Sequence, residues 1–155
     1  RFDNVTGVQT CALPIFARLQ KLQTVSEKFT PRLKSSQLQD ANSSLTAVLT
    51  TANKSIETPA AAQNIDIKKD LKNITALDPP TKLEEKFEEA YLNADLDNTY
   101  AYTMNTELAD TLLMMNRIKE GSRSKSTIDF LEKTISDLTN VRKQLMAITG
   151  DSEKS

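Results

Sequence analysis

The sequence contains no histidine and no tryptophan, and its single cysteine is Cys11. Without histidine the chain cannot form a histidine-based catalytic triad, a histidine-ligated haem or a conventional zinc site. Glycine occurs only three times, and neither Gly121 nor Gly150 precedes the Lys-Ser or Lys-Thr pair of a phosphate-binding loop. We therefore expect a protein that is not an enzyme, and we assign no catalytic, cofactor-binding or metal-binding residue.

An excess of charge of one sign is also lacking. The 155 residues include 20 Lys and Arg against 21 Asp and Glu, which gives a net charge of -1. This balance provides no attraction toward nucleic acid, so we expect no nucleic-acid partner. From Ala17 onward no apolar run is long enough to span a bilayer, although an anchor or a signal peptide encoded upstream stays open.

We interpret residues 1–16 as a segment whose origin differs from that of the rest of the chain. Residues Val5–Ile15 resemble, codon by codon, the translation of an indexing adapter used in short-read DNA libraries. The same reading frame extends the resemblance back to Arg1, and Phe16 can straddle the junction. The alternative is a natural N-terminal strand with a turn at Gly7.

The adapter interpretation divides the chain into three parts. Residues 1–16 are a non-native segment, residues 17–150 form a single helical bundle domain, and residues 151–155 form a disordered tail. Cys11 then belongs to the first part, so the native remainder has no thiol chemistry. A chain without cysteine suits an oxidising compartment as well as the cytosol.

From residue 17 the periodicity is helical, and no sustained alternation typical of strands occurs. The first apolar stripe has spacings of three and four and consists of Leu19, Leu22, Val25, Phe29 and Leu33. Because Pro31 interrupts it, we expect a kink near Phe29, or a new start with Thr30 as cap.

Further along, capping signals and prolines set the expected boundaries. Ser36 and Gln39 have the spacing of a capping box at the start of a helix over 37–57. Residues 58–66 are expected to form a loop with one helical turn at most. Asp66 is the expected cap of a short helix, and the sequence Asp78-Pro79-Pro80 forces an extended turn.

The last two helices are expected to be the longest. One runs from Thr81 to Gly121 without a break, and the other begins near Ser126 and ends at Gly150. We expect both glycines to act as left-handed C-terminal caps. The predicted fold is all-α, an antiparallel up-and-down bundle of three to four long helices with its first hairpin kinked near Pro31.

Acidic residues are the only potential metal ligands that remain. They are Glu84, Glu85, Glu88, Glu89, Asp95, Asp97, Glu107 and Asp110. A ferritin-like centre needs Glu-x-x-His pairs, which this sequence lacks. We interpret these carboxylates as a solvated face paired with neighbouring lysines, and a carboxylate metal protein remains a second alternative.

Two features of the predicted helix over 81–121 are candidates for binding. A polar stripe with spacings of three and four could face a cleft for a small polar ligand, and it consists of Asp95, Asn98, Tyr102 and Asn105. The segment 112–115 is apolar around the whole helix. We expect Leu112 and Met115 in the core, and Leu113 and Met114 to be partly exposed and available to a protein partner or to a second copy.

The stretch from Leu19 to Ile148, with its hairpin sequence Thr30-Pro31-Arg32-Leu33-Lys34-Ser35-Ser36, resembles exported or lipid-anchored helical proteins of the bacterial envelope. This resemblance implies a location outside the cytoplasm and does not indicate any particular activity. A cytoplasmic location stays open. We expect a non-enzymatic helical interaction or structural domain. The first alternative is a helical bundle that binds or senses a small ligand.

Overall fold

The computed structural model describes the backbone of residues 12–154 and the side chains of residues 12–149. In chain order the elements are α1 (Leu13–Phe29), the 3-10 turn η2 (Thr30–Arg32), α2 (Ser36–Ser55), α3 (Glu57–Ala62), α4 (Ile67–Leu77), α5 (Thr81–Leu92), α6 (Leu96–Gly121) and α7 (Lys125–Lys154). No strand occurs among the described residues, and the all-α class is confirmed. Cys11 and Ser155 lie outside the described residues.

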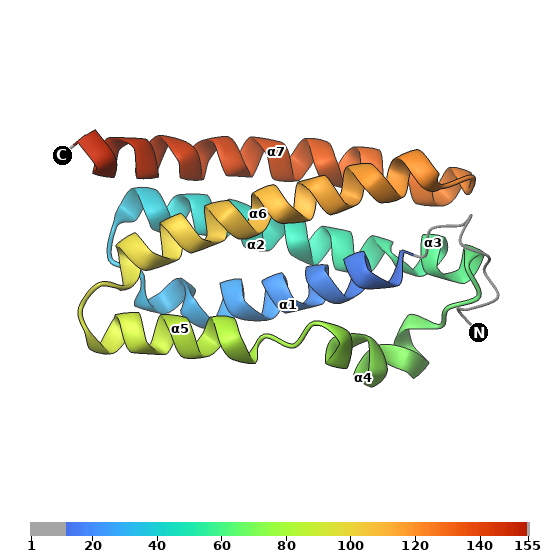
Figure 1. The fold of residues 1–155 in the computed structure, drawn as a ribbon, viewed down its shortest axis with the longest axis horizontal. Coiled ribbons are helices and arrows are strands. Elements are labelled where there is room, and N and C mark those ends of the chain that lie inside the picture. Colours follow the sequence, from blue (N-terminus) through green and yellow to red (C-terminus); the bar gives the residue numbers. More distant parts are fainter. Residues whose placement is uncertain (1–11, 155) are drawn as a thin grey trace.

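The longer helices lie side by side, with similar orientations (Figure 1). The helices α1 and α2 form one hairpin, α5 and α6 form a second, and α7 returns beside α6. The helix α7 also packs against α2 and α3, while α1 contacts α4. These contacts enclose a single apolar core. Between residues 12 and 154, no helix carries an apolar stretch long enough to cross a bilayer.

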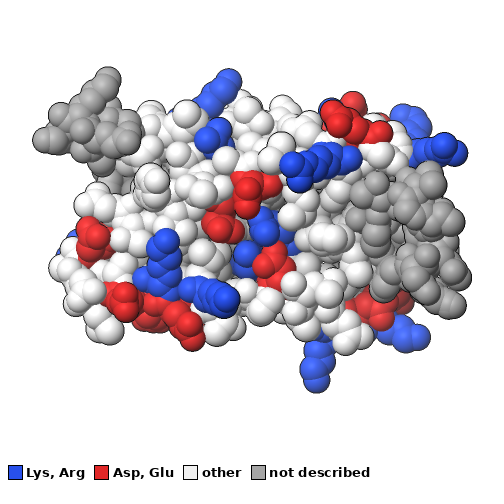
Figure 2. All heavy atoms as spheres, in the orientation of Figure 1, with Lys and Arg blue, Asp and Glu red and all other residues white. Residues whose placement is uncertain are grey.

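Charged side chains of both signs are interspersed on the face of the molecule along which α6 runs (Figure 2). This distribution agrees with the balanced composition of the chain. Where a basic group lies next to an acidic group, the two fields partly cancel.

The helix α1 begins at Leu13, inside the segment 1–16 that the adapter interpretation assigns to a non-native origin. Pro14 occupies its first turn, where the missing N–H of proline costs nothing. Ala12, Ile15 and Phe16 are fully buried, and the ring of Phe16 packs edge-on against Phe130 at 6.4 Å between centroids. The domain as observed therefore includes these residues. Burial does not reveal which DNA encoded them, so the adapter origin of residues 1–16 stays a prediction.

The first hairpin turns at Pro31. The helix α1 ends at Phe29, and the next three residues form the 3-10 turn η2. The α2 cap is Ser35, whose side chain accepts a hydrogen bond from Leu38 N at 3.2 Å, one residue before the predicted cap Ser36. The predicted cap of α4 is correct, because Asp66 accepts a hydrogen bond from Lys69 N.

The prediction of one unbroken helix over 81–121 is wrong. The chain leaves α5 at Leu92 and starts α6 at Leu96 in the opposite direction (Figure 1). In a straight helix, Phe87 and Tyr100 would lie about 20 Å apart at 1.5 Å per residue. In the hairpin their ring centroids are 4.8 Å apart, and Phe87 also packs on Phe29 at 5.4 Å. Burial of these three rings in one core explains the break.

The left-handed helix ends belong to Asn64 and Ala94, not to glycine. Their φ angles are 61° and 58°, and no described glycine has a positive φ. After α5, Asp95 N donates to Ala90 O and Ala94 N donates to Tyr91 O, which is the Schellman pattern. The prediction of glycine caps is therefore wrong, because glycine permits a left-handed turn without imposing one.

The final helix also differs from the predicted boundaries. Its N-terminal cap is Ser124, whose Oγ accepts a hydrogen bond from Thr127 N, and not Ser126. The helix α7 continues through Gly150 to Lys154, because a glycine lowers helix propensity by only about 1 kcal/mol. The predicted tail 151–155 thus overlaps this helix, and only its last residue is outside the described residues.

Candidate interaction surface and neighbouring polar clusters

The apolar segment 112–115 lies near the C-terminal end of α6. Met115 is fully buried, and Leu112 and Met114 are half-buried against the core. The side chain of Leu113 is 51% exposed. The core of the bundle therefore covers only part of this apolar segment. The side chain of Leu113 is the part that remains exposed to solvent. Whether a partner binds there stays a prediction.

A second large side chain on α6 is exposed at the same rotational position. Tyr102 precedes Leu113 by eleven residues, which is close to three full helical turns. Its side chain is 67% exposed. The outer face of α6 thus presents two amphipathic or apolar groups along one line.

The predicted ligand stripe separates into two parts in the structure. Asp95 and Asn98 lie together in the first turn of α6, where the Asp95 carboxylate accepts hydrogen bonds from Asn98 Nδ2 and Thr99 Oγ1 at 3.2 Å each. Asn105 lies beside α7, and its carbonyl accepts a hydrogen bond from Arg142 Nε at 3.4 Å. Tyr102 points to solvent. The four residues do not line one cavity.

A surface hollow of about 460 Å³ lies where the first hairpin meets the turn between α5 and α6. Its lining includes Arg32, Lys34, Tyr91, Leu92, Ala94, Asp95, Leu96, Asp97 and Asn98. The carboxylate of Asp97 accepts hydrogen bonds from the backbone N–H groups of Lys34 and Ser35 at 3.0 and 2.7 Å. Both oxygens of Asp97 therefore hold the residues just before α2, which ties the first hairpin to the start of α6.

Arg32 at the edge of this hollow is also fully engaged. Its guanidinium lies over Phe29 at 5.2 Å and over Tyr91 at 4.9 Å, measured to the ring centroids. Its Nη1 donates to Glu88 Oε1 at 2.6 Å. The hydrogen bond from Arg32 lowers the pKa of Glu88 below its usual range.

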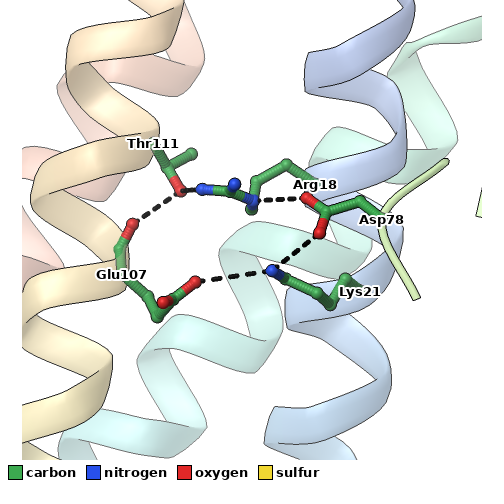
Figure 3. Close-up of polar contacts among 5 residues, drawn as sticks. All are labelled: Arg18, Lys21, Asp78, Glu107 and Thr111. Carbon is green, nitrogen blue, oxygen red and sulfur yellow. Dashed lines mark hydrogen bonds and ion pairs between the residues drawn. The ribbon is translucent and has the colours of Figure 1, made fainter. Parts of the chain in front are cut away.

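A charged cluster that the sequence did not reveal joins α1, α6 and the turn before α5 (Figure 3). We call it the ionic cluster, and its members are Arg18, Lys21, Asp78, Glu107 and Thr111. The Asp78 carboxylate accepts hydrogen bonds from Arg18 Nε at 2.6 Å and from Lys21 Nζ at 2.9 Å. On α6, Lys21 Nζ lies 3.5 Å from Glu107 Oε1, and Arg18 Nη1 donates to Thr111 Oγ1 at 3.3 Å.

The electrostatics of the ionic cluster favour the charged form of Asp78. Burial of Asp78 disfavours its charged form, but the hydrogen bonds from Arg18 and Lys21 outweigh that effect and lower its pKa below the usual value of 3.8. Two cations face two carboxylates, so the cluster has no unpaired charge. Such a cluster fixes α1, α6 and the turn before α5 relative to one another.

An uncharged cluster fills the other end of the α1–α2 hairpin, and we call it the neutral cluster. Its centre is Asn42, which accepts a hydrogen bond from Tyr100 Oη and donates to the carbonyl of Ser26 at 3.1 Å and to Thr30 Oγ1 at 2.7 Å. Thr46 donates to Ser26 Oγ at 3.0 Å. Burial raises the pKa of the Tyr100 hydroxyl well above its ordinary value, so the hydroxyl is protonated and donates.

Three of the acidic residues that the sequence offered as metal ligands form ion pairs with cations of α1. Glu84 and Glu88 lie beside Lys28, at 3.9 and 3.7 Å, and Glu107 lies beside Lys21. Within the part of the chain that the structure describes, no three histidine, cysteine, aspartate or glutamate residues are placed to hold a metal ion.

Comparisons of the chain with family models, with curated proteins and with solved structures gave no match.

Proposed function

We propose that the protein is a non-enzymatic helical interaction domain that uses the outer face of α6 around Leu113 and Met114. The observation that carries this proposal is the 51% exposure of Leu113 within a segment that is apolar around the whole helix. A single exposed leucine is common in soluble proteins. Here it adjoins the half-buried Met114, and Tyr102 is exposed three turns earlier on the same face of the helix.

The scaffold for this surface is, on our proposal, an antiparallel up-and-down bundle whose first hairpin bends at Pro31. The α1–α2 and α6–α7 hairpins support it. The neutral cluster and the ionic cluster join α6 to the first hairpin, so the contact face is presented by a fixed helix. A preformed surface loses little conformational entropy when it binds.

We also propose that the domain works outside the cytoplasm, associated with the envelope or secreted. The support is the resemblance of Leu19–Ile148 to exported and lipid-anchored helical proteins of the bacterial envelope. Independent sequencing of the genomic reading frame upstream of Ala17 tests both this location and the adapter origin. A signal peptide or a lipobox in that frame supports the location, and native codons for residues 5–15 would refute the adapter interpretation.

Substitution of the exposed apolar residues tests the interaction function. In Leu113→Lys we expect a melting temperature within about 2 °C of wild type, since a surface change costs at most about 0.5 kcal/mol. The same variant should lose chemical crosslinks to itself and to proteins of a bacterial extract. In Met114→Lys, which places a charge in a half-buried position, we expect a loss of stability as well as of association.

Asn73→Lys is the matched control, because Asn73 is exposed on α4, outside the proposed surface, and the change adds the same charge. It should keep all crosslinks. If Leu113→Lys keeps them too, or if it destabilises the bundle by several kcal/mol, the outer face of α6 is not an interaction surface.

The hollow at the α5–α6 turn supports a second candidate, a bundle that binds a small polar ligand. The specific observation is the left-handed Ala94, since backbone strain concentrates at ligand sites. Asn98 is exposed there, and the Lys34 ammonium has no partner among the described residues. A metabolite that copurifies with wild type in native mass spectrometry, and not with Asn98→Ala, would establish this function.

A further inference from the structure

We infer that the partner of the α6 surface is a second copy of this chain, bound through an antiparallel α6–α6 contact centred on Leu113 and Met114. This inference rests on the proposed interaction function and names its partner. The observation behind it is the charge pattern that surrounds the exposed leucine.

Two exposed residues of opposite charge flank Leu113 on the same face of α6. Asp110 lies three residues before it and Arg117 four residues after it, spacings that place all three side chains on one side of a helix. All three are exposed. Neither side chain, of Asp110 or of Arg117, forms a hydrogen bond or an ion pair within the part of the chain that the structure describes.

This pattern is complementary to itself when reversed. In a two-fold contact the same patch serves on both partners, so that residue i meets residue j and residue j meets residue i. If the axis passes between Leu113 and Met114, Asp110 of each copy faces Arg117 of the other. The two leucines then meet at the centre. A parallel arrangement would instead place like charges opposite each other, so the charges select the antiparallel contact.

Helix geometry allows close approach along this face. Between Asp110 and Arg117 the exposed position is the leucine itself, and residues 111, 112 and 115 turn toward the bundle. Two helices with one apolar ridge each pack at about 8 to 10 Å between axes. Both ion pairs would lie at the rim of this contact, where they fix orientation and contribute modestly to affinity.

The contact is small, and this sets its strength. A stable complex buries about 800 Å² on each partner, whereas one face of a single helix over about four turns provides less. We expect a reversible dimer with a Kd in the micromolar range. The protein would therefore change from monomer to dimer with concentration.

Sedimentation equilibrium from about 10 µM to 1 mM tests the inference on the full chain, because this range brackets a micromolar Kd. Wild type should shift from monomer toward dimer, and Leu113→Lys should remain a monomer. Asp110→Lys and Arg117→Glu, each alone, should weaken self-association about tenfold, since each variant sets like charges opposite each other twice. All three substituted positions are exposed, and the helical circular dichroism signal checks that each variant folds.

The decisive experiment mixes the two charge variants. In a mixed pair the introduced lysine of Asp110→Lys faces the introduced glutamate of Arg117→Glu, and the remaining Asp110 and Arg117 face each other. The mixture should therefore form a one-to-one heterodimer about as tightly as wild type dimerises, although neither variant associates well alone. The double variant Asp110→Lys with Arg117→Glu should also recover a wild-type Kd.

The outcomes separate this inference from the proposed function. A wild type that stays a monomer at about 1 mM overturns the second copy as partner. The interaction function would survive if Leu113→Lys still abolished crosslinks to another protein. A dimer that is unaffected by Leu113→Lys, or charge variants that fail to rescue each other when mixed, would overturn the antiparallel α6 contact.

Discussion

The neutral cluster and the ionic cluster join the same helices by different physical means. Both connect α1 to α6, the neutral cluster through Asn42 of α2 and the ionic cluster directly, through the contacts of Arg18 and Lys21 with α6. Asn42 and Tyr100 are completely buried and carry no charge, whereas the charged side chains of the ionic cluster retain 10 to 24% of their exposure. The neutral cluster stabilises the fold because its hydrogen bonds pair buried polar groups that water cannot reach. The ionic cluster stabilises the fold through attraction between opposite charges, which water and salt weaken.

The largest effect is expected from Asn42→Ala. The change leaves the buried Tyr100 hydroxyl without its acceptor, at a cost of about 1 to 3 kcal/mol, and it removes the hydrogen bonds to the Ser26 carbonyl and to Thr30 Oγ1, at about 0.5 to 1.5 kcal/mol each. We expect a total loss of about 2 to 4 kcal/mol in the free energy of unfolding, measured with urea, and the same loss at low and high salt. The control Asn98→Ala, at an exposed position, should cost less than about 0.5 kcal/mol. Equal losses in the two variants would show that the neutral cluster does not hold the helices.

A smaller effect, and one that depends on salt, is expected from Asp78→Asn. The amide keeps the shape of the side chain but leaves Arg18 and Lys21 without their shared carboxylate. Because the pair is partly hydrated, we expect a loss of about 1 to 2 kcal/mol that shrinks in 1 M salt. The matched control is Asp137→Asn, which removes an exposed i,i+4 pair with Lys133 and should cost less than about 0.5 kcal/mol. A loss that does not change with salt would contradict the electrostatic interpretation.

The two clusters should also fail at opposite ends of the pH scale. The folded pKa of Asp78 lies below its unfolded value of 3.8, so its contribution is complete above that value and is lost as pH falls through the folded pKa. The folded pKa of Tyr100 lies above its unfolded value of 10.0, so its contribution is complete below that value and is lost as pH rises toward the folded pKa.

Urea titrations across pH test this contrast. The stability gap between wild type and Asp78→Asn should narrow below about pH 4, and the gap between wild type and Tyr100→Phe should narrow above about pH 10. If both gaps narrow at the same end of the scale, one of the two assignments is wrong.

The smallest effect, and a gain, is expected from Ala94→Gly. An alanine in the left-handed region carries a steric cost that glycine avoids, although glycine loses more backbone entropy on folding. We expect a gain of about 0.5 to 1 kcal/mol that does not depend on salt or pH and adds to the effect of either cluster variant. Asn64→Gly should gain less, because asparagine tolerates this conformation. A destabilised Ala94→Gly would mean that the alanine methyl group is needed where it lies.

The helices themselves could be predicted from local patterns, and the reversal at Ala94 could not. Leu19, Leu22 and Val25 are spaced by three and four and are all buried, as their periodicity predicts. The sequence around Ala94 contains no proline and no glycine, and the apolar stripe of α5 continues smoothly into that of α6. The reversal follows from contact between Phe87 and Tyr100, and a contact between distant residues leaves no signal in a local pattern.

The candidate surface could be predicted in part, for a similar reason. An apolar run around a whole helix is visible in the sequence, and it correctly singled out Leu113 as an exposed position. Neither cluster could be found in this way, because Arg18 and Asp78 are 60 residues apart and read as ordinary surface charges. The spacing of Asp110 and Arg117 is visible in the sequence. Their use in a contact could not be inferred from it, because the sequence does not show that this face of α6 is exposed.

The spacing of contacts along the chain also gives the fold an order of assembly. Only residues 122–124 separate α6 from α7, so this hairpin can close early at a small cost in chain entropy. Tyr100 and Asn42 are 58 residues apart, and Arg18 and Thr111 are 93 apart. Both clusters can therefore form only after α1 has packed against the α6–α7 hairpin. In hydrogen exchange during refolding, the amides of α6 and α7 should gain protection first. The two polar clusters should form last, after the α1–α2 hairpin has packed against α6, and they then hold that hairpin in place.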